Sequence, residues 1–154
     1  MLVISDTAAI TSLLKIQQIH LLLALFGEVT IPRGVETELL RYHIDLPAFL
    51  QIKPVGNMEH LASVTQNIDV GEAEAIVLAK ELNADVLLID DKAGRKVAER
   101  EGIKCLGLVG VLLLAKQAGL ITNLTAILER LEQIAGFYLA AKIKHDALRK
   151  AGET

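Results

Sequence analysis

Short apolar runs that alternate with helical patterns are the feature that most constrains the fold of this chain. The segments Leu2–Ser5 and Val86–Ile89 are almost wholly apolar and rich in β-branched residues. A strand with one solvated face would alternate polar and apolar residues, so these strands belong in a parallel sheet covered on both faces. We therefore predict an α/β fold, a three-layer α/β/α domain with a short, mainly parallel central sheet.

The rest of the pattern predicts further strands and helices in alternating order. A short strand is expected at Glu28–Ile31, followed by a helix that Pro32 opens, and another strand is expected at Lys104–Leu108. Phe49–Val55 is ambiguous because prolines flank and interrupt it. Helices are also expected at 71–82, 92–100, 108–117 and 124–134, and a polar C-terminal helix at about 140–150.

Composition and length exclude several classes of protein. An apolar fraction of 52% argues against disorder, and 154 residues favour a single domain over 1–154. The longest uncharged apolar run, Cys105–Ala115, is much shorter than the about 20 residues of a membrane-spanning helix. No basic leader precedes the first strand, so we expect a cytoplasmic protein with no membrane partner. The net charge of −3 is no global signature of a nucleic-acid binder, although a local basic patch remains compatible with it.

Acidic residues directly follow two of the predicted parallel strands. Asp6 follows Leu2–Ser5, and both Asp90 and Asp91 follow Val86–Ile89. The carboxyl ends of parallel strands share one edge of the sheet, and ligands of open α/β sheets bind outside that edge. We therefore expect Asp6 and Asp90 to lie within reach of one metal ion.

Two predicted helices can bring further carboxylates to the same edge. Glu38 lies beside the buried stripe of the helix that Pro32 opens. Glu72 and Glu74 lie in the first turn of the helix at 71–82, where acids also complement the helix dipole. Helical geometry puts Glu72 on the apolar face of that helix, so Glu72 is the more inward candidate and Glu74 the second one.

Carboxylates that converge on one place repel each other, and hard divalent cations relieve this repulsion. Two such ions about 4 Å apart can orient a water and stabilise an in-line displacement at phosphorus. Phosphodiester hydrolysis is then the expected chemistry, without a serine, cysteine or histidine nucleophile. The chain has neither a GxGxxG nor a Walker-type loop, so nothing supports nucleotide binding of those kinds.

Taken in order, these motifs resemble the PIN domain family, particularly its small prokaryotic members of VapC type. Ile4-Ser5-Asp6-Thr7 resembles the opening strand and first acid of the family, and Ile31-Pro32 with Glu38 resembles its second motif. The segments 71–76 and 88–92 resemble the regions of the third and fourth acids. The match runs over almost the whole chain.

The resemblance implies a ribonuclease that depends on Mg²⁺ or Mn²⁺ and acts on an RNA substrate. It implies that the catalytic and metal-binding residues are Asp6, Glu38, Glu72 and Asp90, with Asp91 a further metal ligand and Glu74 a second candidate. Many small members of this family are toxins neutralised by an antitoxin protein, and many form homodimers. Both features are therefore expected here.

Substrate contacts are expected from residues next to the acids. Thr7 follows the first acid, and Lys92, Arg95 and Lys96 lie about one face of the helix after Asp91. A cation at a helix N-terminus is electrostatically disfavoured, which suggests that Lys92 faces a carboxylate or a phosphate. The competing interpretation is a solvated face with local ion pairs.

Two alternatives and one interface remain open at this stage. Ala8 stands where the family commonly has serine or threonine, which leaves a catalytically impaired PIN-like binding or assembly module as the main alternative. Thr7 or Thr11 would have to replace that hydroxyl. A small-molecule phosphatase on a related α/β fold is a weaker option. The apolar runs Leu21–Phe26 and Val111–Leu114 exceed the needs of one buried helical face and predict a homodimer interface.

Overall fold

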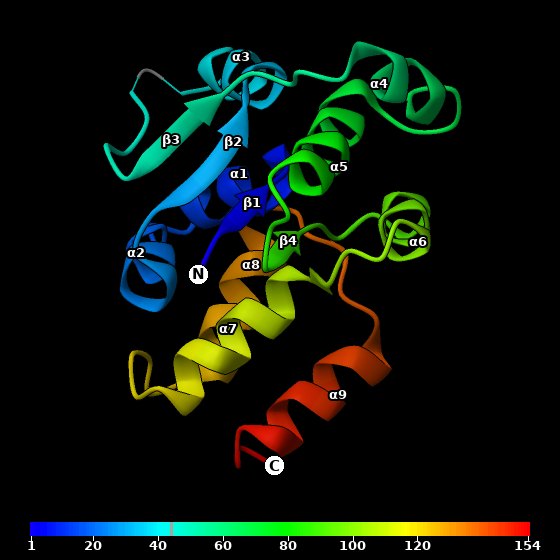
Figure 1. The fold of residues 1–154 in the computed structure, drawn as a ribbon. Coiled ribbons are helices and arrows are strands. Elements are labelled where there is room, and N and C mark those ends of the chain that lie inside the picture. Colours follow the sequence, from blue (N-terminus) through cyan, green and yellow to red (C-terminus); the bar gives the residue numbers. More distant parts are fainter. Residues whose placement is uncertain (44) are drawn as a thin grey trace.

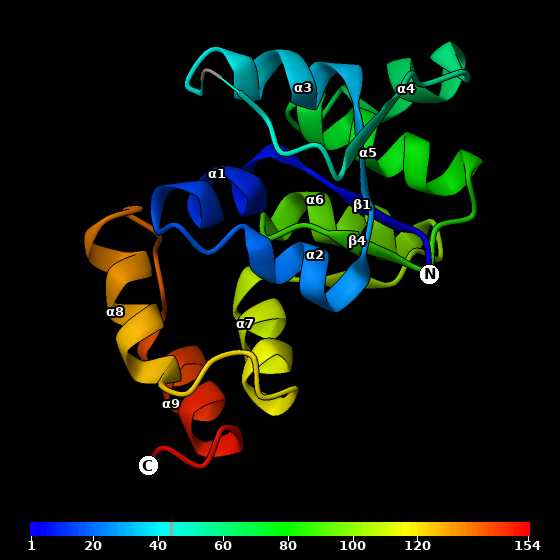
Figure 2. The same ribbon diagram turned by 90° about the vertical axis from the view of Figure 1, so that its left-hand side faces the viewer.

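A five-stranded parallel sheet forms the centre of the computed structural model, which describes residues 1–43 and 45–154. Its order is β3-β2-β1-β4-β5, so the chain starts in the middle of the sheet. Helices lie on both sides of it (Figures 1 and 2), which confirms the predicted α/β architecture. The strands are β1 (Val3–Ser5), β2 (Val29–Pro32), β3 (Leu50–Lys53), β4 (Val86–Leu88) and β5 (Cys105–Leu106).

The helices agree with the predicted ones to within two residues where a helix was expected. Three helices were not anticipated from the sequence: α1 directly after β1, α2 between α1 and β2, and α4 in the segment after β3. The helices are α1 (Thr7–Lys15), α2 (His20–Phe26), α3 (Arg33–Leu40), α4 (Met58–Val64), α5 (Val70–Glu81), α6 (Lys92–Arg100), α7 (Leu108–Gln117), α8 (Leu124–Gln133) and α9 (Ala141–Lys150). None of the described helices is long and apolar enough to cross a membrane.

Three details of the predicted elements are corrected. The strand expected at Lys104–Leu108 contains only Cys105 and Leu106, because Leu108 already begins α7. The ambiguous segment forms the edge strand β3, in which only Leu50 is buried. Pro32 ends β2 and stands in the N-cap position of α3 rather than inside its first turn.

Each face of the sheet carries its own apolar core, which explains why the strands lack polar alternation. Ile4 and Leu87 are neighbours in the sheet and pack against α5 with α4 and α6. Val3 and Leu88 point to the opposite face, where α1, α2 and α7 cover them and α8 and α9 complete the layer. Burial of both strand faces is the arrangement typical of parallel sheets.

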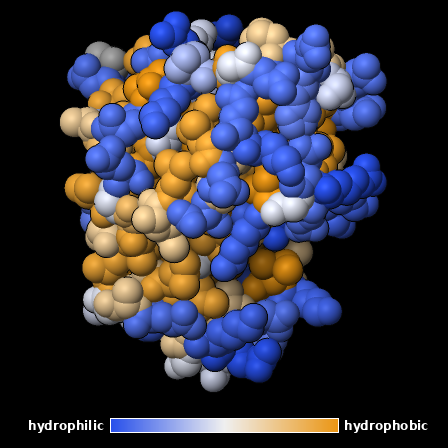
Figure 3. Space-filling model, in the orientation of Figure 1, coloured by the Kyte–Doolittle hydropathy of each residue, from blue (hydrophilic) through white to orange (hydrophobic). Residues whose placement is uncertain are grey.

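The apolar runs of α2 and α7 are largely used within the chain. Leu21 and Leu22 of α2 and Val111 of α7 are completely buried in the core on this face. Leu23 and Leu114 are 50% and 39% exposed, and Figure 3 shows apolar side chains gathered over this side of the molecule. The homodimer interface remains a prediction, and these exposed side chains would form part of it.

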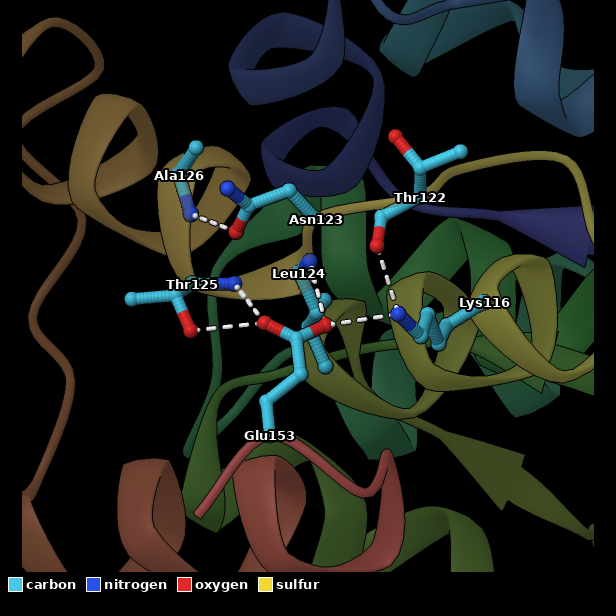
Figure 4. Close-up of polar contacts among 7 residues, drawn as sticks. All are labelled: Lys116, Thr122, Asn123, Leu124, Thr125, Ala126 and Glu153. Carbon is cyan, nitrogen blue, oxygen red and sulfur yellow. Dashed lines mark hydrogen bonds and ion pairs between the residues drawn. The ribbon is translucent and has the colours of Figure 1, made fainter.

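A carboxylate near the C-terminus holds the last three helices together (Figure 4). Glu153 accepts hydrogen bonds from the backbone N–H groups of Leu124 (2.7 Å) and Thr125 (2.9 Å), so it caps the N-terminus of α8. It also pairs with the Lys116 ammonium of α7 at 3.0 Å. The hydrogen bond from the Thr125 hydroxyl is the largest cause that lowers the pKa of Glu153 from 4.5 to about 2.

We expect Glu153→Gln to lower the free energy of unfolding by about 1–2 kcal/mol at pH 7. Because the folded-state pKa lies below the unfolded one, the stabilisation by Glu153 is fully present above pH 4.5 and is lost as the pH falls toward 2. Urea unfolding of the wild type and the variant at several pH values measures this. Glu129→Gln, an exposed change on α8, is the control. A stability difference that did not depend on pH would contradict the prediction.

Candidate functional site

A cleft of about 560 Å³ opens at the carboxyl end of β1. Figure 2 shows β1 ending beside α1 and beneath α3, and these two helices provide much of its walls. The position agrees with the general rule that open α/β sheets bind ligands outside the carboxyl ends of their strands. The lining residues are Asp6, Thr7, Ala8, Thr11, Lys15, Glu38, Tyr42, His43, Asp69 and Glu72.

Asp6 lies at the bottom of this cleft and is only 2% exposed. Burial is the largest cause that raises its pKa from 3.8 to about 8, and the carboxylates of Asp90 and Glu72 raise it further. The backbone N–H groups of Ala8 and Ala9 act in the opposite direction. Its buried Oδ1 has no hydrogen-bond partner among the described residues, so this oxygen is available to a ligand.

Glu72 lines the same cleft from the first turn of α5. Burial and then the Asp91 and Asp69 carboxylates raise its pKa from 4.5 to about 7. Its Oε2 is also buried without a partner among the described residues. Gly94 makes room for it, because a Cβ at that position would stand 2.6 Å from Glu72 Oε2. The two most perturbed carboxylates of the cleft are therefore Asp6 and Glu72.

Glu38 reaches the cleft from α3 and is fixed there by the start of α1. The Thr7 hydroxyl donates a hydrogen bond of 2.8 Å to Glu38 Oε2. Gly71 allows this approach, since a Cβ there would lie 3.0 Å from the same oxygen. Thr7, which the sequence suggested as a substrate contact, thus orients a carboxylate in this structure.

Asp90 stands close to Asp6 but outside the lining of the cleft. Its two carboxylate oxygens accept the Leu108 N–H at 3.0 and 3.2 Å, so it caps the N-terminus of α7. Burial raises its pKa, whereas this N–H and the Arg95 guanidinium lower it. Gly107 gives the carboxylate its space, because a Cβ there would lie 2.8 Å from Asp90 Oδ1.

Asp91 caps α6, the helix that follows it in the chain, and its charge affects the Glu72 carboxylate in the cleft. Its side chain accepts the Gly94 N–H at 3.0 Å at the start of α6, and its charge raises the pKa of Glu72. Lys92 and Lys96 are exposed on α6, and neither of them lines the cleft. The α6 cations therefore stand beside the acidic site rather than within it.

Glu74 lies apart from the other acids. Its carboxylate accepts the Gly34 N–H at 3.3 Å, at the beginning of α3, and it does not line the cleft. A Cβ on residue 34 would overlap the Glu74 carboxylate, so the glycine at this position leaves space for this side chain. Because α5 begins at Val70, Glu72 is in its first turn and lines the cleft, whereas Glu74, expected in the same turn, lies beyond it.

The carboxylates fit a divalent cation by their chemistry. Within residues 1–43 and 45–154, no group of three or more His, Cys, Asp or Glu side chains already stands in an arrangement that holds a metal ion. Among the residues that the structure describes, Asp6 and Glu72 nevertheless each present a buried oxygen without a partner, and other carboxylates raise the pKa of both. A hard cation would supply the missing partner and lower such pKa values.

Several residues that line the cleft were not predicted as site residues from the sequence. Thr11 and Lys15 lie on α1, a helix that was not anticipated, although Thr11 was considered as a replacement hydroxyl. Tyr42 and His43 follow the end of α3, and Asp69 is the N-cap residue of α5. The apolar spacing that follows Asp6 is the signal that would have revealed α1 and its cleft-facing side.

We expect Asp6→Asn to stabilise the protein by on the order of 2 kcal/mol at pH 8 when EDTA removes divalent ions. The folded-state pKa is raised from 3.8 to about 8, so the cost of the charged group appears above pH 3.8 and grows up to about pH 8. The stability gain should therefore vanish toward pH 4. Urea unfolding measures this, with exposed Asp45→Asn as the control. Equal free energies of unfolding for the wild type and Asp6→Asn at pH 8 would show that burying the Asp6 charge does not destabilise the fold.

Comparison with known proteins identifies the family of the chain. The sequence pattern of the PIN domain family matches residues 2–153, which is nearly the entire chain. The search of curated proteins gave no match. The match extends over the sheet, the carboxylate cleft and the C-terminal helices, and it shows that this chain belongs to the PIN domain family, a nuclease fold.

Proposed function

We propose that the protein is a metal-dependent ribonuclease that hydrolyses RNA phosphodiester bonds with Mg²⁺ or Mn²⁺. The observation that carries this proposal is a pair of buried oxygens in one cleft, Asp6 Oδ1 and Glu72 Oε2, which have no hydrogen-bond partner among the described residues. Membership of a nuclease fold family supports hydrolysis of nucleic acid. Asp6, Glu38, Glu72 and Asp90 are the proposed catalytic and metal-binding residues, with Asp91 a further ligand.

Hydrogen bonds from neighbouring residues hold two of the proposed catalytic carboxylates in position. A bound divalent ion would neutralise the gathered charge and activate a water for attack on phosphorus. Thr7 orients Glu38 by its hydrogen bond, and the N-terminus of α7 orients Asp90. Because a hydroxyl and a backbone N–H already hold Glu38 and Asp90, these two carboxylates lose little freedom when an ion binds.

A catalytically impaired module is the second candidate, because Ala8 lines the cleft without a hydroxyl. The Thr11 hydroxyl stands in the same cleft, buried and without a partner among the described residues, and this favours an active enzyme. The finer proposal of an antitoxin-controlled toxin rests on the resemblance to small PIN domains. Exposed Leu23 and Leu114 offer apolar area for a second subunit.

We expect Asp6→Asn to reduce Mn²⁺-dependent cleavage of a labelled single-stranded oligoribonucleotide by at least about 100-fold, because it removes the most buried carboxylate of the proposed site. Glu74→Gln is the control, since Glu74 is an acid on α5, the helix of Glu72, but lies outside the cleft. That variant should cleave within about threefold of the wild-type rate.

Two results would overturn the proposal. Cleavage at the wild-type rate by Asp6→Asn would show that Asp6 is not part of the machinery. An absence of both Mn²⁺ binding by calorimetry at millimolar concentrations and RNA cleavage would favour the impaired module.

A further inference from the structure

The buried polar atoms without partners are concentrated in the cleft. Among the described residues, they are Asp6 Oδ1, Thr11 Oγ1, His43 Nε2 and Glu72 Oε2, and all four residues line it. A buried polar atom without a hydrogen bond is costly, and its presence in a native protein calls for an explanation. The proposed metal ions account for the two carboxylates. Thr11 and His43 remain, and they imply a second ligand group in the same cleft.

The charge of the cleft lining changes along α1, from carboxylates at its start to a lysine at its end. Thr7, Thr11 and Lys15 follow each other at four-residue spacing, so they share one face of this helix. The nine residues from Thr7 to Lys15 span about 12 Å along the helix axis. No ion pair is found for Lys15 within residues 1–43 and 45–154, whereas the other end of the cleft holds Asp6 and Glu72. A polyanion entering at the carboxylate end would meet this cation next.

The cleft also carries an aromatic ring, from the segment that follows α3. Tyr42 lines the cleft but leaves 74% of its surface exposed, so its ring stands at the rim. Aromatic side chains at the edge of a charged groove bind unpaired bases by stacking. Tyr138 is 87% exposed but lies in the connection between α8 and α9, away from the cleft.

We propose that the Lys15 end of the cleft is a nucleotide subsite adjoining the catalytic carboxylates. Tyr42 stacks on an unpaired base, and Lys15 pairs with the phosphate next to the scissile one. Thr11 Oγ1 and His43 Nε2 hydrogen-bond to oxygens of the same nucleotide. The subsite rests on the proposed nuclease function and specifies its substrate, because a base that stacks on Tyr42 cannot be paired within a duplex.

Binding measured without cleavage tests the subsite separately from the chemistry. In an Asp6→Asn background with Mg²⁺, fluorescence anisotropy follows a labelled single-stranded oligoribonucleotide and its duplex. Tyr42→Leu should weaken single-strand binding about tenfold, whereas Tyr42→Phe keeps the ring and should stay within about twofold. Tyr138→Leu replaces the exposed tyrosine outside the cleft and should have no effect.

A second variant tests the phosphate contact. Lys15→Met should weaken binding and reduce the slope of log Kd against log salt by about 0.7, the amount expected for one phosphate of a single strand. Lys142→Met, an exposed change on α9, is the control and should leave both quantities unchanged.

Tyrosine fluorescence tests the contact directly, because the chain has no tryptophan and two tyrosines. In Tyr138→Leu, Tyr42 is the remaining tyrosine, so all tyrosine emission comes from it. Because the ring of Tyr42 stacks on a base in the proposed subsite, this emission should be quenched when RNA binds. An oligonucleotide with an abasic site at the contacted position should abolish the quenching. The same abasic site should weaken binding to the parent protein but not to Tyr42→Leu.

The results separate failure of the subsite from failure of the nuclease proposal. If Asp6→Asn abolishes cleavage but Tyr42→Leu binds RNA normally and no quenching occurs, the subsite is wrong and the nuclease stands. Duplex binding as tight as single-strand binding would also overturn the subsite. If Asp6→Asn cleaves normally, the nuclease proposal fails whatever the binding data show. Thermal unfolding of each variant confirms that it is folded.

Discussion

Burial of the Asp6 carboxylate at the end of β1 is the constraint to which the surrounding structure responds. Removing a charged group from water costs several kcal/mol unless partners compensate it, and here the carboxylates of Asp90 and Glu72 add to the cost. An apolar residue would serve the stability of the fold better at this position. A protein retains such a local conflict where a ligand resolves it, and natural proteins break the rules of stability mainly at functional sites.

The acids of the site are also parts of the framework. Asp90 caps α7 and Asp91 caps α6, so the helices after β4 and β5 are anchored to the residues that follow β4. Gly94 and Gly107 lie where a Cβ would crowd a carboxylate, which lets these helices approach closely. The favourable dipole at a helix N-terminus offsets part of the repulsion among the gathered charges. Stability and site geometry therefore depend on the same contacts.

The arrangement of charge explains how an acidic protein can act on a polyanion. The net charge of −3 describes the whole chain, whereas the cleft carries carboxylates at one end and Lys15 at the other. Arg95 lies beside Asp90, so a second cation stands near the acids from the side of α6. Metal ions at the carboxylate end would make the whole path attractive to a phosphate backbone.

The sequence alone determined the layered α/β fold and the edge of the sheet that carries the acids, because apolar periodicity and strand ends are local properties. It also favoured Glu72 over Glu74, since the face of one helix depends only on spacing. Only the tertiary structure decided that Tyr42 and His43 line the same cleft as Thr11. Their proximity depends on how α1 packs against α3, and periodicity identifies the face of a helix without identifying its partner.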